Sequence, residues 1–107
     1  MDWRVEFMND DVRAALDAMP DEIGAAFLRT AEMIQGNGLE QMREPYLKHL
    51  QGPLWEVRLK GKDGIARAVY VTVTGHRVVV VHVLSKKTWI TPGRDIETVL
   101  RKVREVK

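Results

Sequence analysis

The chain has 107 residues, 45% of them hydrophobic and 30% charged, which is enough for one globular domain and too little for two. It contains no cysteine, which excludes a disulfide scaffold, a thiolate metal site and a cysteine nucleophile. Residues 1–53 carry five basic and ten acidic side chains, and residues 54–107 carry twelve and five, so the two halves have net charges of −5 and +7. The basic half suggests a polyanionic partner such as a nucleic acid, with a merely solvated charged surface as the simpler alternative.

Localisation and cofactors are constrained by what the sequence lacks. No apolar run approaches the roughly 18–20 residues of a membrane span, and residues 1–7 lack the apolar segment of a secretory signal. We therefore expect a cytoplasmic protein with no membrane partner. The three histidines are scattered and no glycine-rich phosphate loop or metal-binding motif is present, so we expect no metal and no small-molecule cofactor.

Hydrophobic periodicity and capping residues predict seven elements. In chain order they are a strand over 3–7, a helix capped by Asn9 or Asp10 and reaching about Met19, a helix opened by Pro20 and stopped at 36–38, strands over 55–60, 65–74 and 78–84, and a helix opened by Thr91 and Pro92. Residues 36–53 are irregular and are expected to form a loop with a short turn. Glycine-containing turns at 61–64 and 75–76 separate the three later strands.

This order, β-α-α-β-β-β-α, predicts an α+β fold. Three consecutive strands with short turns imply an antiparallel meander, and the N-terminal strand is expected to join this small antiparallel sheet. The two N-terminal helices pack on one face. The strand over 78–84 is almost continuously apolar, so we expect it at the centre of the sheet with both faces covered.

Basic side chains on the later strands are the main candidates for function. In chain order they are Arg58, Lys60, Arg67, Arg77, Lys86 and Lys87, with Trp89 beside them as a possible platform for a stacked base. Neighbouring strands lie about 4.8 Å apart, so these residues are able to line one groove. Solvated cations on an open sheet face are the alternative.

Arg67 and His82 lie in apolar surroundings. Arg67 shares a strand face with Ile65 and Val69, where an unpaired guanidinium is costly. It therefore either pairs with an acid such as Glu56 or points into an anion site. His82 is expected to share a face with Leu84 and Val80, where a lone histidine is more often structural than catalytic.

Four segments carry a resemblance to a known family. They are Leu54-Trp55-Glu56-Val57-Arg58, Arg67-Ala68-Val69-Tyr70, His82 to Thr88 (HVLSKKT), and Thr91-Pro92 at the start of the last helix. Together they resemble the phage-derived, HigB-like branch of the RelE/ParE toxin superfamily, over nearly the whole chain. The resemblance implies one RelE-like toxin domain over residues 1–107. It also implies a type II toxin that cuts mRNA on the ribosome without a metal and is neutralised by a helix-turn-helix antitoxin.

The resemblance also implies roles for individual residues. The 2′-hydroxyl of RNA attacks the adjacent phosphate, and positioned cations stabilise the charge of the transition state. The residues implied in catalysis are Arg58, Arg67, Lys86 and Lys87, with Arg67 as the clamp on the transition state. Those implied in RNA binding are Lys60, Tyr70, Arg77, His82 and Trp89. Trp89-Ile90 departs from the polar pair of many relatives, which puts the usual codon preference in doubt.

Two alternatives stay open. A toxin of the same fold can act on another target, such as DNA gyrase, and would leave mRNA intact. A non-catalytic module that partners a DNA-binding regulator would not arrest growth at all. Arg67→Ala is expected to remove toxicity while changing stability by no more than about 1 kcal/mol, as for a mostly functional charge. A large loss of stability would instead identify Arg67 as a structural ion-pair partner.

Overall fold

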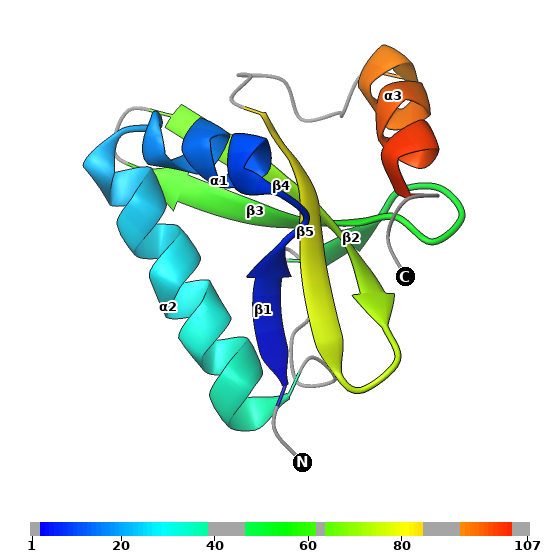
Figure 1. The fold of residues 1–107 in the computed structure, drawn as a ribbon. Helices are drawn as coiled ribbons and strands as arrows, with labels where there is room; N and C mark the ends of the chain where they lie inside the picture. Colours follow the sequence, from blue (N-terminus) through cyan, green and yellow to red (C-terminus); the bar gives the residue numbers. More distant parts are fainter. Residues whose placement is uncertain (1–2, 39–46, 62–63, 85–92, 104–107) are drawn as a thin grey trace.

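A computed structural model describes residues 3–38, 47–61, 64–84 and 93–103 (Figure 1). Its elements in chain order are β1 (Arg4–Phe7), α1 (Asp10–Asp17), α2 (Asp21–Asn37), β2 (Leu47–His49), β3 (Trp55–Gly61), β4 (Gly64–Val73), β5 (Arg77–Leu84) and α3 (Gly93–Val103). The seven predicted elements are present. The irregular segment predicted over 36–53 is wrong at β2, whose three residues are too few to show a period. In the described part of the chain, no helix is both long and apolar enough to cross a membrane.

The five strands form one sheet in the order β1-β5-β4-β3-β2. Strands β2 to β5 pair antiparallel, which confirms the predicted meander. However, β1 pairs parallel with β5, so the sheet is mixed and the prediction of an antiparallel sheet is wrong. The alternating pattern of residues 3–7 determines which side chains are buried but carries no information on strand direction. The α+β class is confirmed. Strand β5 is an interior strand between β1 and β4, but β4 occupies the middle of the five, so the predicted central position of residues 78–84 is wrong by one strand.

Helices cover the two faces of the sheet, and each face has its own apolar core. The first face lies under α1 and α2, where Val57, Tyr70 and Val80 pack against helix residues such as Phe27. The second face lies under α3, where Val71 and other apolar residues of β4 and β5 pack with residues of that helix. Figure 1 shows α1 and α2 on one side of the sheet and α3 on the other. Strands β4 and β5 are therefore buried from both sides.

Local sequence signals fix the ends of the N-terminal helices. The side chain of Asn9 accepts a hydrogen bond from the Val12 amide at 3.0 Å, which is the expected N-terminal cap of α1. Helix α2 ends at Gly38, whose φ of 86° favours glycine. At the other end of α2, a Cβ on Gly61 of β3 would lie 2.8 Å from Ile23 Cδ1. Glycine at position 61 therefore lets α2 pack closely against the sheet.

Candidate nucleic-acid interface

Two arginines lie directly opposite each other on the second face. The register of β3 and β4 pairs Arg58 with Arg67. Like charges at directly opposite positions repel. Glu56 lies between them: its Oε1 is 3.5 Å from Arg67 Nε and 3.6 Å from Arg58 Nε. We refer to Glu56, Arg58 and Arg67 as the arginine–glutamate cluster, in which one carboxylate faces two guanidinium groups.

Burial divides this cluster into an interior part and a part next to solvent. Glu56 and Arg67 are 0% exposed. The side chain of Arg58 is 21% exposed, and Lys60, two residues further along β3, is exposed. A buried charge is tolerated when an opposite charge lies beside it. Of the two interpretations of Arg67, the structure therefore favours the ion pair with Glu56, and it leaves Arg58 and Lys60 as the cations that border solvent.

His82 lies on the second face because of an irregularity in the sheet. The pairing of β4 with β5 shifts register between Val69 and Tyr70, so Val69 lies opposite His82 while Tyr70 lies opposite Val80. His82 consequently shares a face with Leu84 but not with Val80, in contrast to the strict alternation predicted. Since Arg67 pairs with Leu84, His82 is its diagonal neighbour across the two strands. His82 is partly exposed and lies near the cluster.

Arg77 does not belong to this group. It begins β5, whereas Leu84, the partner of Arg67, ends it, so the two positions lie about 23 Å apart along the strand. Arg77 donates hydrogen bonds to Glu6 of β1 at 2.7 and 3.1 Å. This pairing lowers the pKa of the Glu6 carboxyl and raises that of the Arg77 guanidinium. The prediction that Arg77 lines the same groove is wrong.

Tyr70 is also separated from the cluster. It is buried among the residues of the first face, and this burial raises the pKa of its hydroxyl. Arg67 and Tyr70 are three residues apart on one strand, and an odd spacing places side chains on opposite faces. The predicted RNA contact of Tyr70 therefore conflicts with the structure, and its role is to pack the core. The spacing alone contained this signal.

The remaining candidates follow β5. Lys86, Lys87 and Trp89 lie outside the described residues, so their roles stay predictions. Sequence reasoning missed Lys48 as a cation near the cluster: it lies on the unpredicted strand β2 and pairs in register with Glu56. Finding it required knowing that residues 47–49 form a strand. Within the described part of the chain, no group of three or more histidine, aspartate or glutamate side chains is arranged to hold a metal ion.

Comparison with known proteins gave one family. Residues 14–104 match the family model described as phage-derived Gp49-like proteins (DUF891). The match extends from within α1 to the end of α3 and so includes the whole arginine–glutamate cluster. A search of curated proteins found no match.

Proposed function

Because the chain belongs to the Gp49-like family of phage-derived proteins, we propose that it is the toxin of a toxin–antitoxin pair. The family is a RelE-like toxin family, which supports this assignment and a partner antitoxin. We further propose that the toxin is a metal-independent endoribonuclease of the HigB-like branch. In this proposal it cuts mRNA on the ribosome in the cytoplasm, and a helix-turn-helix antitoxin neutralises it.

The observation that carries the ribonuclease proposal is the arginine–glutamate cluster. In the proposed reaction the 2′-oxygen forms a bond to phosphorus, the bond from phosphorus to the 5′-oxygen breaks, and a cyclic phosphate is left. The proton of the 2′-hydroxyl is removed and the leaving 5′-oxygen receives a proton. Negative charge grows on the phosphate oxygens in the transition state, and fixed cations stabilise it.

The burial of the cluster divides the work between its residues. Arg58 borders solvent, so we assign it to the phosphate at the cut, with Lys60 on a neighbouring phosphate. Arg67 is buried against Glu56, and Glu56 also faces Arg58. We therefore assign to this buried pair the orientation of the Arg58 guanidinium. Lys86 and Lys87 are proposed to contact the scissile or the flanking phosphate, and His82 and Trp89 to contact flanking parts of the RNA.

Primer extension on a reporter mRNA tests the proposal. The wild type and Arg58→Gln are each induced without antitoxin, and Arg4→Gln serves as the matched control because it removes an exposed arginine from the far end of the same sheet. The expected result is a set of discrete cuts within the translated region for the wild type and Arg4→Gln, and at least a tenfold loss of cutting for Arg58→Gln. Removing the start codon of the reporter should abolish the cuts if the ribosome is required.

Other outcomes identify other functions. Growth arrest with intact mRNA contradicts the ribonuclease proposal and leads to a different target, with DNA breaks indicating gyrase. Normal growth of cells that hold folded wild-type protein contradicts the toxin proposal. It would favour a non-catalytic module that binds a DNA-binding regulator.

A further inference from the structure

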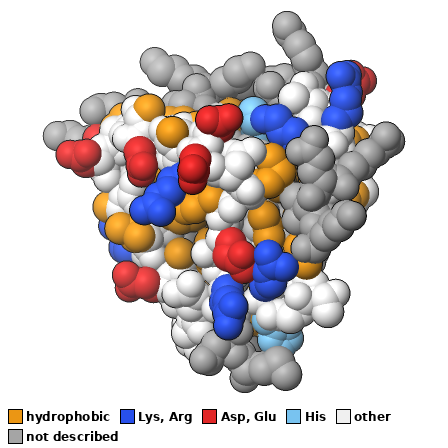
Figure 2. All heavy atoms as spheres, in the orientation of Figure 1, with side chains coloured by type: hydrophobic (Ala, Val, Ile, Leu, Met, Phe, Trp, Pro, Cys, Tyr) orange, Lys and Arg blue, Asp and Glu red, His pale blue; other side chains and the backbone are white. Residues whose placement is uncertain are grey.

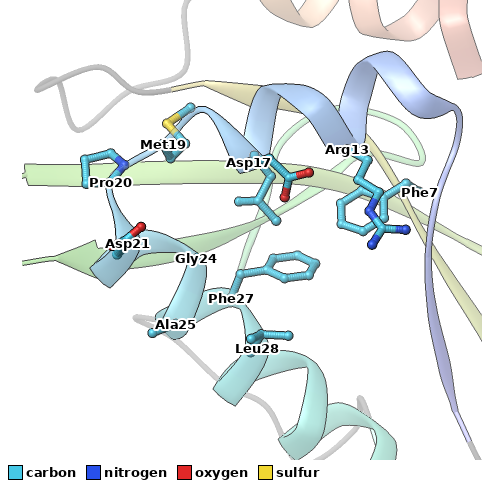
Figure 3. Close-up of a pocket in the computed structure, with 11 residues that line it drawn as sticks. Phe7, Arg13, Asp17, Met19, Pro20, Asp21, Gly24, Ala25, Phe27 and Leu28 are labelled. Carbon is cyan, nitrogen blue, oxygen red and sulfur yellow. The ribbon is translucent and has the colours of Figure 1, made fainter.

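A groove of about 490 Å³ lies between α1 and α2, on the opposite side of the sheet from the arginine–glutamate cluster (Figure 3). Apolar side chains of β1, α1 and α2 line it, among them Phe7, Leu16 and Phe27. The rings of Phe7 and Phe27 stack with their centroids 5.4 Å apart. Figure 3 shows Phe27 projecting from α2 into the space below α1. The groove is therefore an apolar depression with an aromatic wall.

One wall of the groove is an apolar side chain left in solvent. Leu28 of α2 lines the groove and is 61% exposed, the largest exposed fraction among the large hydrophobic residues in the described part of the chain. A depression with an exposed leucine at its edge offers apolar area to a partner. Covering this area would remove it from water, which is the main favourable contribution to most protein association.

The rim of the groove is acidic. Residues 10–22, which form α1 and the first turn of α2, carry five acidic side chains and one arginine, a net charge of −4. Two of these acids, Asp17 and Asp21, line the groove itself, as does Arg13. Figure 2 shows acidic side chains around the apolar patch over α1 and α2. This charge repels a nucleic acid or an anionic lipid surface and attracts a cationic partner.

We propose that the α1–α2 groove binds an amphipathic helical segment of another protein, with leucine-like side chains on one face and Lys or Arg beside them. The apolar face of the segment packs against Phe27 and Leu28 in the groove, and its cations pair with Asp17 and Asp21. When a helix binds in an apolar groove, its contacts come from apolar side chains spaced three and four residues apart along that helix. The site is independent of the proposed ribonuclease, because it lies on the first face.

Glycines of α2 allow a test that leaves the fold intact. Gly24 lines the groove, and a Cβ built on it meets no atom within 4 Å. Gly24→Leu therefore adds a side chain to the groove lining, and its Cβ displaces no neighbour. Gly36 lies in the same helix outside the groove lining and has equally open surroundings, so Gly36→Leu is the matched control. Both changes raise helix propensity, so both variants should melt at or above the wild-type temperature.

The probe is a fluorescein-labelled helical peptide of about three turns, with leucine at helical spacing on one face and lysine beside it. A second peptide keeps the leucines and carries glutamate in place of lysine. Fluorescence anisotropy with the full chain should show that the lysine peptide binds the wild type and Gly36→Leu alike. Gly24→Leu should bind it at least tenfold more weakly, and the glutamate peptide should bind the wild type at least tenfold more weakly. Asp17→Lys combined with Asp21→Lys should reverse the preference between the two peptides.

Several results would overturn the proposal. Equal binding of the lysine peptide to Gly24→Leu and the wild type would show that the groove is not the site. Equal binding of the two peptides would remove the assigned chemistry of the partner. A self-associated wild type that Gly24→Leu converts to a monomer in sedimentation experiments would assign the groove to a second copy of this chain. Displacement of the peptide by RNA would assign it to nucleic acid. None of these results depends on whether the protein cuts mRNA.

Discussion

Arg67→Ala should destabilise the protein by about 3 kcal/mol, because it removes a cation that lies beside a fully buried carboxylate. Breaking a buried ion pair by removing one partner costs roughly 3–5 kcal/mol, and we expect the lower end because Arg58 still faces Glu56 at 3.6 Å. For a domain of this size, such a loss lowers the melting temperature by about 12 °C or more. The structure thus replaces the expectation from sequence that this change costs no more than about 1 kcal/mol.

A double replacement tests whether the cost of Arg67→Ala comes from leaving a buried charge without its partner. Glu56→Leu combined with Arg67→Met removes both buried charges and keeps apolar side chains of similar length. Apolar replacement of a buried pair is often neutral or stabilising, so we expect stability within about 1 kcal/mol of the wild type. Urea unfolding followed by circular dichroism measures both variants. A loss of less than about 1 kcal/mol for Arg67→Ala, with an unchanged denaturant slope, would refute the reasoning, because it would show that the pair contributes little.

Three further predictions follow from single residues. Gly61→Ala should cost about 1 kcal/mol in thermal unfolding, at the low end for overpacking, because its Cβ would displace the Cδ1 end of Ile23 and no backbone atom; Gly64→Ala, its register partner with open surroundings, should not destabilise. Glu6→Gln should be less stable than the wild type at neutral pH, because the variant loses the ion pair with Arg77. Since this pairing lowers the pKa of Glu6, the difference in stability should shrink as the pH falls below 4.5 and vanish below the lowered pKa. Urea titrations at a series of pH values measure this difference. Tyr70→Phe should keep full growth arrest, because the hydroxyl lies in the core on the opposite face from the cluster; a loss of toxicity in a folded variant would contradict this placement.

The sequence predicted best the elements that have a long run of patterned apolar residues or a clear capping residue. The near-continuous apolar run of β5 indicated a strand covered on both faces, and the side chain of Asn9 caps α1 as expected. Strand β2 was not predicted, because three residues are too few to show an alternating pattern. Lys48 was therefore not recognised as a residue of the sheet. The parallel direction of β1 was not predicted, because its pairing with β5 joins segments far apart in the sequence and depends on the tertiary fold.

The candidate site followed from sequence only in part. A short turn predicted between β3 and β4 was enough to place Arg58 opposite Arg67, since pairing of Gly61 with Gly64 fixes the register three residues further along both strands. The apolar face of Arg67 could be predicted from the alternation of its strand, but its complete burial could not, because complete burial depends on the tertiary packing around that face. The sheet face on which His82 lies depends on a register shift between β4 and β5, and no residue in either strand indicated that shift.

The parallel pairing of β1 with β5 has a consequence for how the chain acquires its structure. Strand β1 forms its sheet bonds with β5, which is synthesised much later, because Arg4 pairs with Arg77. Both apolar cores also need β5, which lies between β1 and β4 in the sheet and contributes residues to each of them. Contacts between such distant parts of a chain are slow to form, because the closure of a long loop precedes any gain from packing. This fold therefore cannot be completed on a nascent chain before β5 has been synthesised.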